Sequence, residues 1–442
     1  NIPQFPLASL PKPYRMNERL LQYIWQFQHF AASELLTTSG EPVQILYQGQ
    51  YNTNQGPDFS NAKIKIGGTT WVGSVELHIR STDWDKHKHQ HDRNYDNVIL
   101  HVVWEDDGWN YPVPVLELKG RVPGVLLNRY TLLMENPGFI PCEKNITGIS
   151  ELSWTSWKDR LMAERLERKS ALLYQFLEQN GNHWEEATWW MMARSFGIKV
   201  NTEAFENMAR SLPVPLLAKQ KHQLILLEAL LMGQAGLLVD EKPADKYYNL
   251  LQREYRFQQN KYKLRPITVP IHFLRMRPGN FPTVRLAQLA VLLFQSESLF
   301  AKIKETRSLE ELKRFFDVTA NDYWHYHYSF DETSTYKPKK LGTVMLDNII
   351  INTIAPLLFA YGSYHHEQEY KDRAIQWLEQ TAAESNTITR SFQKLGVGNK
   401  NAFDSQALIE LKQSYCDKKR CLECAVGAGL LRSQESGVGS QE

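Results

Sequence analysis

The pattern of apolar and polar positions divides the chain into two differently built parts. Apolar side chains recur at helical spacing over residues 17–37, and short β-type runs separated by glycine, proline and asparagine follow. The runs cover residues 43–47, 62–66, 71–79 and 98–104. Gly67-Gly68 predicts a hairpin turn between the second and third runs, and the polar segment 81–97 has room for one short helix. The predicted order is helix, three strands, helix or loop, and strand, with a further strand over 113–118.

Beyond residue 141 the pattern changes to longer segments with helical spacing. These segments are 154–178, 183–196, 202–211, 219–237, 283–298, 308–316, 345–361 and 366–383. We expect an α/β domain over residues 16–140 and a mainly α-helical region over 150–425. Residues 320–343 read as an irregular connector, and the tail 433–442, rich in Ser, Gly, Gln and Glu, as disordered.

The composition is that of a soluble globular protein, with 42% hydrophobic and 23% charged residues among 442. An apolar run of about eighteen residues, which would predict a transmembrane helix, is absent from the sequence. The first residues lack the layout of a secretory signal, and we expect the natural start near Met16. Four cysteines are too few for a disulfide scaffold of this length. We therefore expect a cytoplasmic protein with reduced or metal-bound thiols and no membrane partner.

The total charge is nearly balanced, with 51 basic and 49 acidic residues, but it is unevenly distributed. Residues 253–285 contain eight basic side chains and one acid, interleaved with aromatic residues. Basic side chains neutralise phosphates and aromatic faces stack on bases, so this composition predicts a surface for DNA or RNA. A solvated basic segment with its aromatic residues in the core has the same composition. The candidate nucleic-acid-binding residues are Arg265, Arg275, Arg277 and Arg285.

The helix expected to begin near Thr283 adds a second reason to single out these arginines. The free N–H groups of a helix N-terminus attract anions, so a phosphate site beside Arg277 and Arg285 is one interpretation. The other is a helix cap in which the arginines pack on aromatic residues or pair with acids.

Two acids and a histidine lie where two predicted strands would meet. Asp58 precedes one strand, and Glu76 and His78 lie two residues apart on the next, so the latter two share one face. Phosphodiester hydrolysis commonly uses a hard divalent ion held by carboxylates, with another group that orients the attacking water. We expect Asp58 and Glu76 to bind Mg²⁺ or Mn²⁺ and His78 to orient the water.

A cluster of histidines follows directly. His87, His89 and His91 alternate, so an extended segment would place all three on one side. With His78 and His101 from neighbouring strands, these imidazoles would suit a transition metal. Two other interpretations remain: His87, His89 and His101 support the acidic site, or His101 is a hydrogen-bonded core residue and the others are solvated.

These residues and the predicted element order resemble the PD-(D/E)XK nuclease superfamily over about residues 17–105. The core of that superfamily is a helix, three strands, a helix and a strand, so the resemblance implies a restriction-endonuclease-like mixed sheet. Asp58 matches the aspartate of the PD half, Glu76 the second acid, and His78 the position usually held by lysine. Histidine can serve as a base near pH 7, but it departs from the superfamily pattern.

The chain as a whole resembles an uncharacterised bacterial family catalogued as domain of unknown function 2851, from Met16 to about Leu431. The family name implies no reaction. The resemblance is carried by Asn54-Gln55-Gly56-Pro57-Asp58-Phe59, Gly73-Ser74-Val75-Glu76-Leu77-His78, Asp83-Trp84 with His87 and His89, Val98-Ile99-Leu100-His101-Val102-Val103, the segment Arg277 to Leu286, and the C-terminal cysteine motif.

Three of the four cysteines lie close together near the C-terminus. Cys416, Cys421 and Cys424 have the spacing C-x4-C-x2-C, and Cys142 lies far upstream. Thiolates spaced in this way suit an iron–sulfur cluster or a zinc ion, and the alternative is that they hold no metal. Some nucleases of the PD-(D/E)XK superfamily resemble this arrangement, with three C-terminal cysteines and one distant cysteine around an iron–sulfur cluster. In those proteins the lone cysteine precedes the nuclease motifs, whereas Cys142 follows them.

Three hypotheses follow for the function. The first is a divalent-metal-dependent nuclease that uses Asp58, Glu76 and His78 and binds nucleic acid through the basic segment. The second is a non-catalytic nucleic-acid-binding or scaffold protein with the same fold. The third is another metal-dependent hydrolase built on the histidine cluster. Convergence of Asp58, Glu76 and His78 favours the first, and convergence of the other histidines favours the third.

Overall fold

The computed structural model describes residues 16–52, 55–110, 112–239, 245–273, 277–330 and 332–432. The chain forms two compact units. The first, called here the α/β unit, combines residues 1–154 with 412–442, and the second, the helical unit, spans 155–411. The sequence analysis expects residues 412–425 in the helical region, whereas in the structure they belong to the α/β unit. The expected disordered tail lies outside the described residues.

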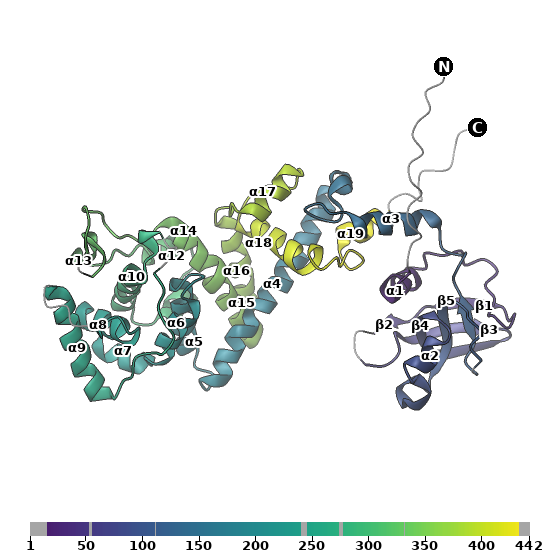
Figure 1. Cartoon of the computed structure of the whole chain (residues 1–442), viewed down its shortest axis with the longest axis horizontal. Helices are drawn as coiled ribbons and strands as arrows, with labels where there is room; N and C mark the ends of the chain where they lie inside the picture. Colours follow the sequence, from purple (N-terminus) through teal and green to yellow (C-terminus); the bar gives the residue numbers. More distant parts are fainter. Residues whose placement is uncertain are drawn as a thin grey trace, which may run out of the picture. The chain divides into compact units, whose positions relative to one another are not determined.

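The α/β unit is built on a mixed sheet with the strand order β1-β3-β4-β5-β6, and β2 pairs with β3 (Figure 1). Neighbouring strands are antiparallel from β1 to β4 and parallel from β4 to β6. The sequence order of helix, three strands, helical segment and strand is therefore present. The strands are β1 (Val43–Tyr47), β2 (Gln50–Tyr51), β3 (Phe59–Ile66), β4 (Thr69–Arg80), β5 (Val98–Glu105) and β6 (Val115–Glu117).

Helix α1 (Glu18–Gln26) packs against β4 and is shorter than the predicted helix over 17–37. Its N-cap Asn17 accepts a hydrogen bond from the backbone N–H of Leu20 at 3.0 Å. The helix ends because Gln28 has a left-handed backbone, with φ of 52°. The apolar residues after Gln26 continue the helical spacing in the sequence, which explains the overlong prediction.

The central strand β4 is buried from Ser74 to His78, so side chains on both of its faces lie in the interior. Gly73 permits the close approach of β5, because a Cβ atom there would lie 2.4 Å from the carbonyl oxygen of Asn97. Helix α2 (Asp83–Lys86) follows β4 and packs on it. This packing encloses the polar side chains of β4 between secondary-structure elements.

The remaining elements of the α/β unit bring the two ends of the described chain together. Helices α3 (Gly124–Glu135) and α19 (Ala425–Arg432) contact one another. Tyr23 of α1 donates a hydrogen bond to the carbonyl oxygen of Ala428 at 3.5 Å. The C-terminal segment is thus part of the packing of this unit.

The helical unit has one continuous apolar core. Its helices are α4 (Glu151–Gln179, which begins in the α/β unit), α5 (Trp184–Phe196), α6 (Thr202–Arg210), α7 (Val214–Gln220), α8 (Leu224–Gln234), α9 (Lys246–Tyr262), α10 (Pro282–Gln295), α11 (Leu299–Glu305), α12 (Leu309–Phe315), α13 (Asp322–His325), α14 (Thr343–Ile349), α15 (Ala355–His365), α16 (Gln368–Gln380), α17 (Thr387–Lys394) and α18 (Ala402–Glu410). The mainly helical character predicted for this region is confirmed.

Details of the helical prediction differ from the structure. The single helix expected over 219–237 is divided between α7 and α8. The expected connector 320–343 contains α13 and a small hairpin of β7 (His327–Ser329) and β8 (Glu332–Thr333). A continuous helical stretch, Thr343–His365, is long and apolar enough to cross a membrane, but 67% of its most apolar window is buried inside the protein, as in a core helix.

Candidate metal and catalytic centre

The two acids predicted for the site lie side by side. Asp58 directly precedes β3, and Phe59 pairs with Val75 of β4, which places Glu76 next to Asp58. The Glu76 Oε2 atom accepts a hydrogen bond from the backbone N–H of Asp58 at 3.0 Å. In return, Asp58 Oδ2 accepts one from the backbone N–H of Leu77 at 3.1 Å. The strand pairing therefore fixes both carboxylates relative to the sheet.

Burial changes the protonation of Asp58. Burial and, after it, the neighbouring charge of Glu76 raise the pKa of its carboxyl to about 8, although the Leu77 N–H and the Gln22 side chain oppose the rise. Gln22 of α1 donates a hydrogen bond to Asp58 Oδ1 at 2.7 Å. A cation beside the two acids would favour their charged forms, because opposite charge lowers a carboxyl pKa.

His78 is buried among other imidazoles, with 1% of its surface exposed. Its Nδ1 lies 2.9 Å from Nε2 of His101, and its Nε2 lies 3.1 Å from Nδ1 of His87. Burial, followed by the neighbouring histidines, lowers the pKa of His78 to about 2, and burial lowers that of His101 to about 3. Both rings are therefore neutral at pH 7, which is the form that binds metal ions.

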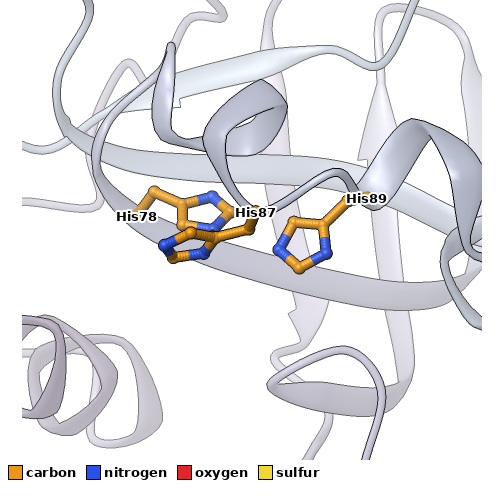
Figure 2. Close-up of side chains that lie close together, drawn as sticks. All are labelled: His78, His87 and His89. Carbon is orange, nitrogen blue, oxygen red and sulfur yellow. The ribbon is translucent and has the colours of Figure 1, made fainter.

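His87 and His89 complete a group of three imidazoles with His78 (Figure 2). Their donor nitrogens all lie within 4.8 Å of one another. His87 ends α2, and Lys88 has a left-handed backbone with φ of 62°, so the chain turns and returns His89 to the same place. This turn, and not the extended segment that the alternation suggested, brings the histidines together. His91 lies in the following 3₁₀ turn (His89–His91) and does not belong to the group.

The carboxylate of Glu76 adjoins this histidine group. Its Oε1 atom lies 3.4 Å from His89 Nε2 and 3.6 Å from His78 Nε2. Within the described part of the chain, His89 Nε2 is buried and lacks a hydrogen-bond partner. A buried nitrogen in this state is costly unless a ligand meets it. The Glu76 carboxylate therefore lies beside two of the three imidazoles, His78 and His89.

Aromatic side chains hold the imidazoles in position. The ring of Tyr95 stacks on His89 with the centroids 3.8 Å apart, and the buried Trp84 contacts His89, His78 and His101 edge-on or tilted. Trp84 belongs to one of the motifs by which the sequence resembles its family. Its packing against the histidines is known only from the structure. These contacts restrict the rings in the way that the surroundings of metal ligands usually do.

Helix α1 contributes two residues that the sequence interpretation missed. Glu18 is half-buried near the centre, and burial raises its pKa while the charges of His87 and Glu76 also act on it. Gln22 lies one helical turn further along on the same face. The amphipathic pattern predicted this helix. It did not show whether a polar residue in the first turn faces solvent or the candidate site.

The four predicted arginines do not form one group. Arg277 and Arg285 line the same cavity in the helical unit. Arg265 is exposed in the segment after α9 and does not line that cavity. Arg275 lies outside the described residues. The histidine–carboxylate centre belongs to the α/β unit, so the candidate chemistry and the arginine cavity lie in different units.

The four cysteines all belong to the α/β unit and are free thiols. Burial raises the pKa of Cys142 and of Cys421 to about 12, and it also raises that of Cys416. The thiols of Cys421 and Cys424 raise the pKa of Cys142 further, and those of Cys424, Cys142 and Cys421 act on Cys416 in the same direction. Residues separated by more than 270 positions in the sequence are therefore close neighbours in the fold.

These features describe a mixed α/β protein with a partly buried histidine–carboxylate centre and a larger helical unit. The chain belongs to the family described as "Protein of unknown function (DUF2851)", whose model matches residues 18–387. The matched range includes the acids and histidines of the centre and ends before the three C-terminal cysteines. Searches of curated proteins and of solved structures gave no match.

Proposed function

We propose that this protein is a divalent-metal-dependent hydrolase of phosphodiester bonds, with its reaction centre in the α/β unit. The observation that carries the proposal is the meeting of Glu76 with His78, His87 and His89, beside Asp58. A nuclease-like reaction is the activity that this combination of acids, imidazoles and sheet supports best.

The donor set fits a divalent transition metal better than magnesium. Neutral imidazoles suit Zn²⁺, Fe²⁺ and related ions, whereas Mn²⁺ and, most strongly, Mg²⁺ prefer oxygen ligands and water. His78, His87, His89 and Glu76 would hold the ion, and the unpartnered Nε2 of His89 is the clearest sign that a ligand is required. Of the two ions expected from the sequence, Mn²⁺ is therefore favoured over Mg²⁺. Zn²⁺ is a further candidate for the site. A bound divalent ion would supply Lewis acidity and lower the pKa of a water molecule.

The roles of the residues are divided between the two sides of the Glu76 carboxylate. Its Oε1 atom faces His78 and His89, and its Oε2 atom faces the backbone of Asp58. Both ring nitrogens of His78 face other imidazoles, so His78 is better suited to bind metal than to orient water. We assign the positioning of the attacking water to Asp58, whose oxygens each keep a second lone pair beside their single hydrogen bonds.

The substrate class is supported by the element order and by the position of the acids. Asp58 at the start of β3 and Glu76 on β4 take the places that the PD-(D/E)XK resemblance gives to its two metal-binding acids. The fold assignment to that superfamily is part of this proposal. This chain has His78 where the superfamily usually has lysine. In the proposed centre, His78 binds the metal ion.

Cleavage of linear, single-stranded and structured nucleic acids with Mn²⁺, Zn²⁺ or Mg²⁺ tests the proposal. The wild type is compared with Glu76→Gln and with His91→Gln, an exposed histidine of the same segment that lies outside the centre. Metal-dependent cleavage lost in Glu76→Gln and kept in His91→Gln supports the proposal. Binding of nucleic acid without cleavage in any variant would favour the non-catalytic alternative. Metal-dependent hydrolysis of other esters, with nucleic acids untouched, would favour a different hydrolase.

For the cysteines, we propose a structural metal site that ties the C-terminal segment to the rest of the α/β unit. Four buried or half-buried thiols gather there without forming disulfides. Thiolates with the spacing of Cys416, Cys421 and Cys424, and with Cys142 nearby, suit an iron–sulfur cluster or a zinc ion.

Oxygen-free purification followed by visible absorption and by iron, sulfide and zinc analysis tests this second site. Iron and sulfide that are lost together in Cys421→Ser would support the cluster. Stoichiometric zinc would support the alternative metal. Protein that is free of all three and equally stable as Cys421→Ser would contradict a metal at the cysteines.

A further inference from the structure

The helical unit contains a cavity lined by an unusual set of cations. Its volume is about 670 Å³, within the range of sites for small molecules and cofactors. Five basic residues line it, and among the described residues no aspartate or glutamate does. The basic residues are Arg277, Arg285, Lys337, Lys339 and Lys340. The last three come from a segment that the sequence indicated only as an irregular connector.

Arg285 is a buried cation that lacks a carboxylate partner within the described chain. It lies in the first turn of α10 and is 6% exposed. Its guanidinium donates hydrogen bonds to the amide oxygens of Asn280, at 2.5 Å, and Gln288, at 2.9 Å, and its Nε lacks a partner among the described residues. Burial lowers the pKa of Arg285 only to about 10, so the group stays charged at pH 7. Neutral amides orient this charge but do not neutralise it.

Lys339 is a second buried cation on the same cavity, with 4% of its surface exposed. Its ammonium group donates to the carbonyl oxygens of His325 and Lys337 and lies 3.7 Å from the ring centroid of Tyr328. Gln288 links the two residues, since it accepts a hydrogen bond from the Arg285 guanidinium and donates one to the backbone carbonyl oxygen of Lys339 at 3.0 Å. Among the described residues, neither cation has a carboxylate partner.

Burying charge without a partner is costly, so such an arrangement is typical of a site completed by an anion. The exposed Arg277, Lys337 and Lys340 add further positive charge around the opening. The remainder of the lining is mostly apolar, including Ile198, Val284 and Met345. A ligand that fits both features has a multiply charged anionic group and an apolar or aromatic body.

We infer that this cavity binds a nucleoside phosphate, with its phosphate group on Arg285, Lys339 and the neighbouring cations and its base against the apolar wall. The nucleoside phosphate is either a free nucleotide or the phosphorylated end of a nucleic-acid strand. The inference concerns the helical unit and does not rest on the reaction proposed for the α/β unit. It also explains why Arg277 and Arg285 lie with three lysines that are more than 50 positions away in the sequence.

Competition against a fluorescent ATP analogue, followed by anisotropy on the full chain, tests the inference. The solution contains EDTA, so that metal-dependent reaction at the other centre does not contribute. Competitors are ATP, AMP, pyrophosphate, adenosine, and one oligonucleotide with and without a 5′-phosphate. Lys340→Met removes an exposed cation of the cavity and Arg285→Met a buried one. Arg256→Met removes an exposed cation of α9, which does not line the cavity and serves as the matched control.

We expect ATP and AMP to compete and adenosine to compete poorly. Loss of one charged contact in Lys340→Met or Arg285→Met should weaken binding about tenfold. Competition by free nucleotides identifies a nucleotide as the source, and competition by the 5′-phosphorylated oligonucleotide alone identifies a strand end. The inference is overturned if the analogue does not bind saturably, if adenosine competes as well as AMP, or if Arg256→Met weakens binding as much as Lys340→Met. Because Lys340 is exposed, its variant remains informative even if Arg285→Met does not fold.

Discussion

The α/β unit and the helical unit each bury a carboxylate among polar side chains. Only in the helical unit do the surrounding side chains donate hydrogen bonds to the carboxylate. Glu228 of α8 is fully buried, and Tyr247, Asn321 and Trp324 all donate hydrogen bonds to its carboxylate. Glu76 of β4 instead faces imidazole nitrogens, and one of these, His89 Nε2, makes no hydrogen bond within the described chain.

The difference shows how to distinguish a structural polar network from a ligand site. Burial raises the pKa of Glu228 to about 7 although its hydrogen bonds oppose the rise, and burial is also the main cause of the raised pKa of Asp58. A perturbed pKa therefore does not separate the two regions. The separating feature is the kind of partner, since Glu228 meets three hydrogen-bond donors whereas Glu76 Oε1 meets imidazoles that are potential metal ligands.

The largest expected effect is on the activity of the histidine–carboxylate centre. Glu76→Gln keeps the shape of the side chain but removes its charge, so we expect metal-dependent cleavage to fall by at least about 1000-fold, equivalent to about 4 kcal/mol of transition-state stabilisation. Initial rates at saturating Mn²⁺ measure it. Equal rates in Glu76→Gln and His91→Gln would show that the centre is not where the reaction occurs.

Glu228 should control the pH dependence of stability instead of activity. Its pKa rises from 4.5 in the unfolded chain to about 7 in the folded one, so the folded state binds more protons between these values. The resulting stabilisation is present below pH 4.5 and is lost as the pH rises through 7. Between pH 5 and pH 8 the wild type should lose about 2 to 3 kcal/mol of unfolding free energy relative to Glu228→Gln.

Urea unfolding of both proteins at several pH values between 5 and 8 measures this difference. A constant gap between the two proteins over that range would mean that Glu228 is ionised in the folded state throughout, contrary to its raised pKa.

Metal binding at the histidine–carboxylate centre should stabilise the protein. At a free Mn²⁺ or Zn²⁺ concentration of about 100 times Kd, the gain is about 2.7 kcal/mol, which raises the melting temperature by a few degrees. His89→Gln should lose this gain, and His91→Gln should keep it. Differential scanning calorimetry in EDTA and in excess metal provides the measurement, and an equal shift in both variants would place the metal elsewhere.

The smallest expected effect concerns Tyr95. Its ring stacks on His89, and phenylalanine preserves that contact, so Tyr95→Phe should change metal affinity by less than about threefold. Tyr95→Ala removes the stack and should weaken binding by about tenfold, as is usual for groups that position ligands. Isothermal titration of the two variants compares them, and similar losses in both would mean that the hydroxyl group is essential.

Much of the α/β unit could be predicted because its signals are local. β-type runs located the strands, and Gly67-Gly68 located the turn between two of them. The hairpin predicts that the start of β3 lies near Glu76, but the pairing of Phe59 with Val75 also depends on a register shift between Phe59 and Ala62, which the local pattern does not show. The end of α1 at Gln26 could not be predicted, because the apolar spacing continues beyond it.

The rest of the centre depends on contacts that local patterns do not encode. His87 and His89 meet His78 only because the chain turns at Lys88, a position with a left-handed backbone and no glycine to signal it. In the helical unit, α9 (Lys246–Tyr262) was not predicted at all, because its basic and aromatic composition was attributed to a surface for nucleic acid. The cavity joins α10 to residues 337–340 through tertiary packing alone.

The most direct test of the account is the number and environment of metal ions bound to the α/β centre. Mn²⁺ titration followed by electron paramagnetic resonance should show one tightly bound ion per chain in the wild type and in His91→Gln, with nitrogen couplings from imidazole ligands. The same ion should be lost or weakened at least about 100-fold in His89→Gln and Glu76→Gln. Unchanged binding in these two variants, or a bound ion without nitrogen couplings, would contradict the histidine–carboxylate centre.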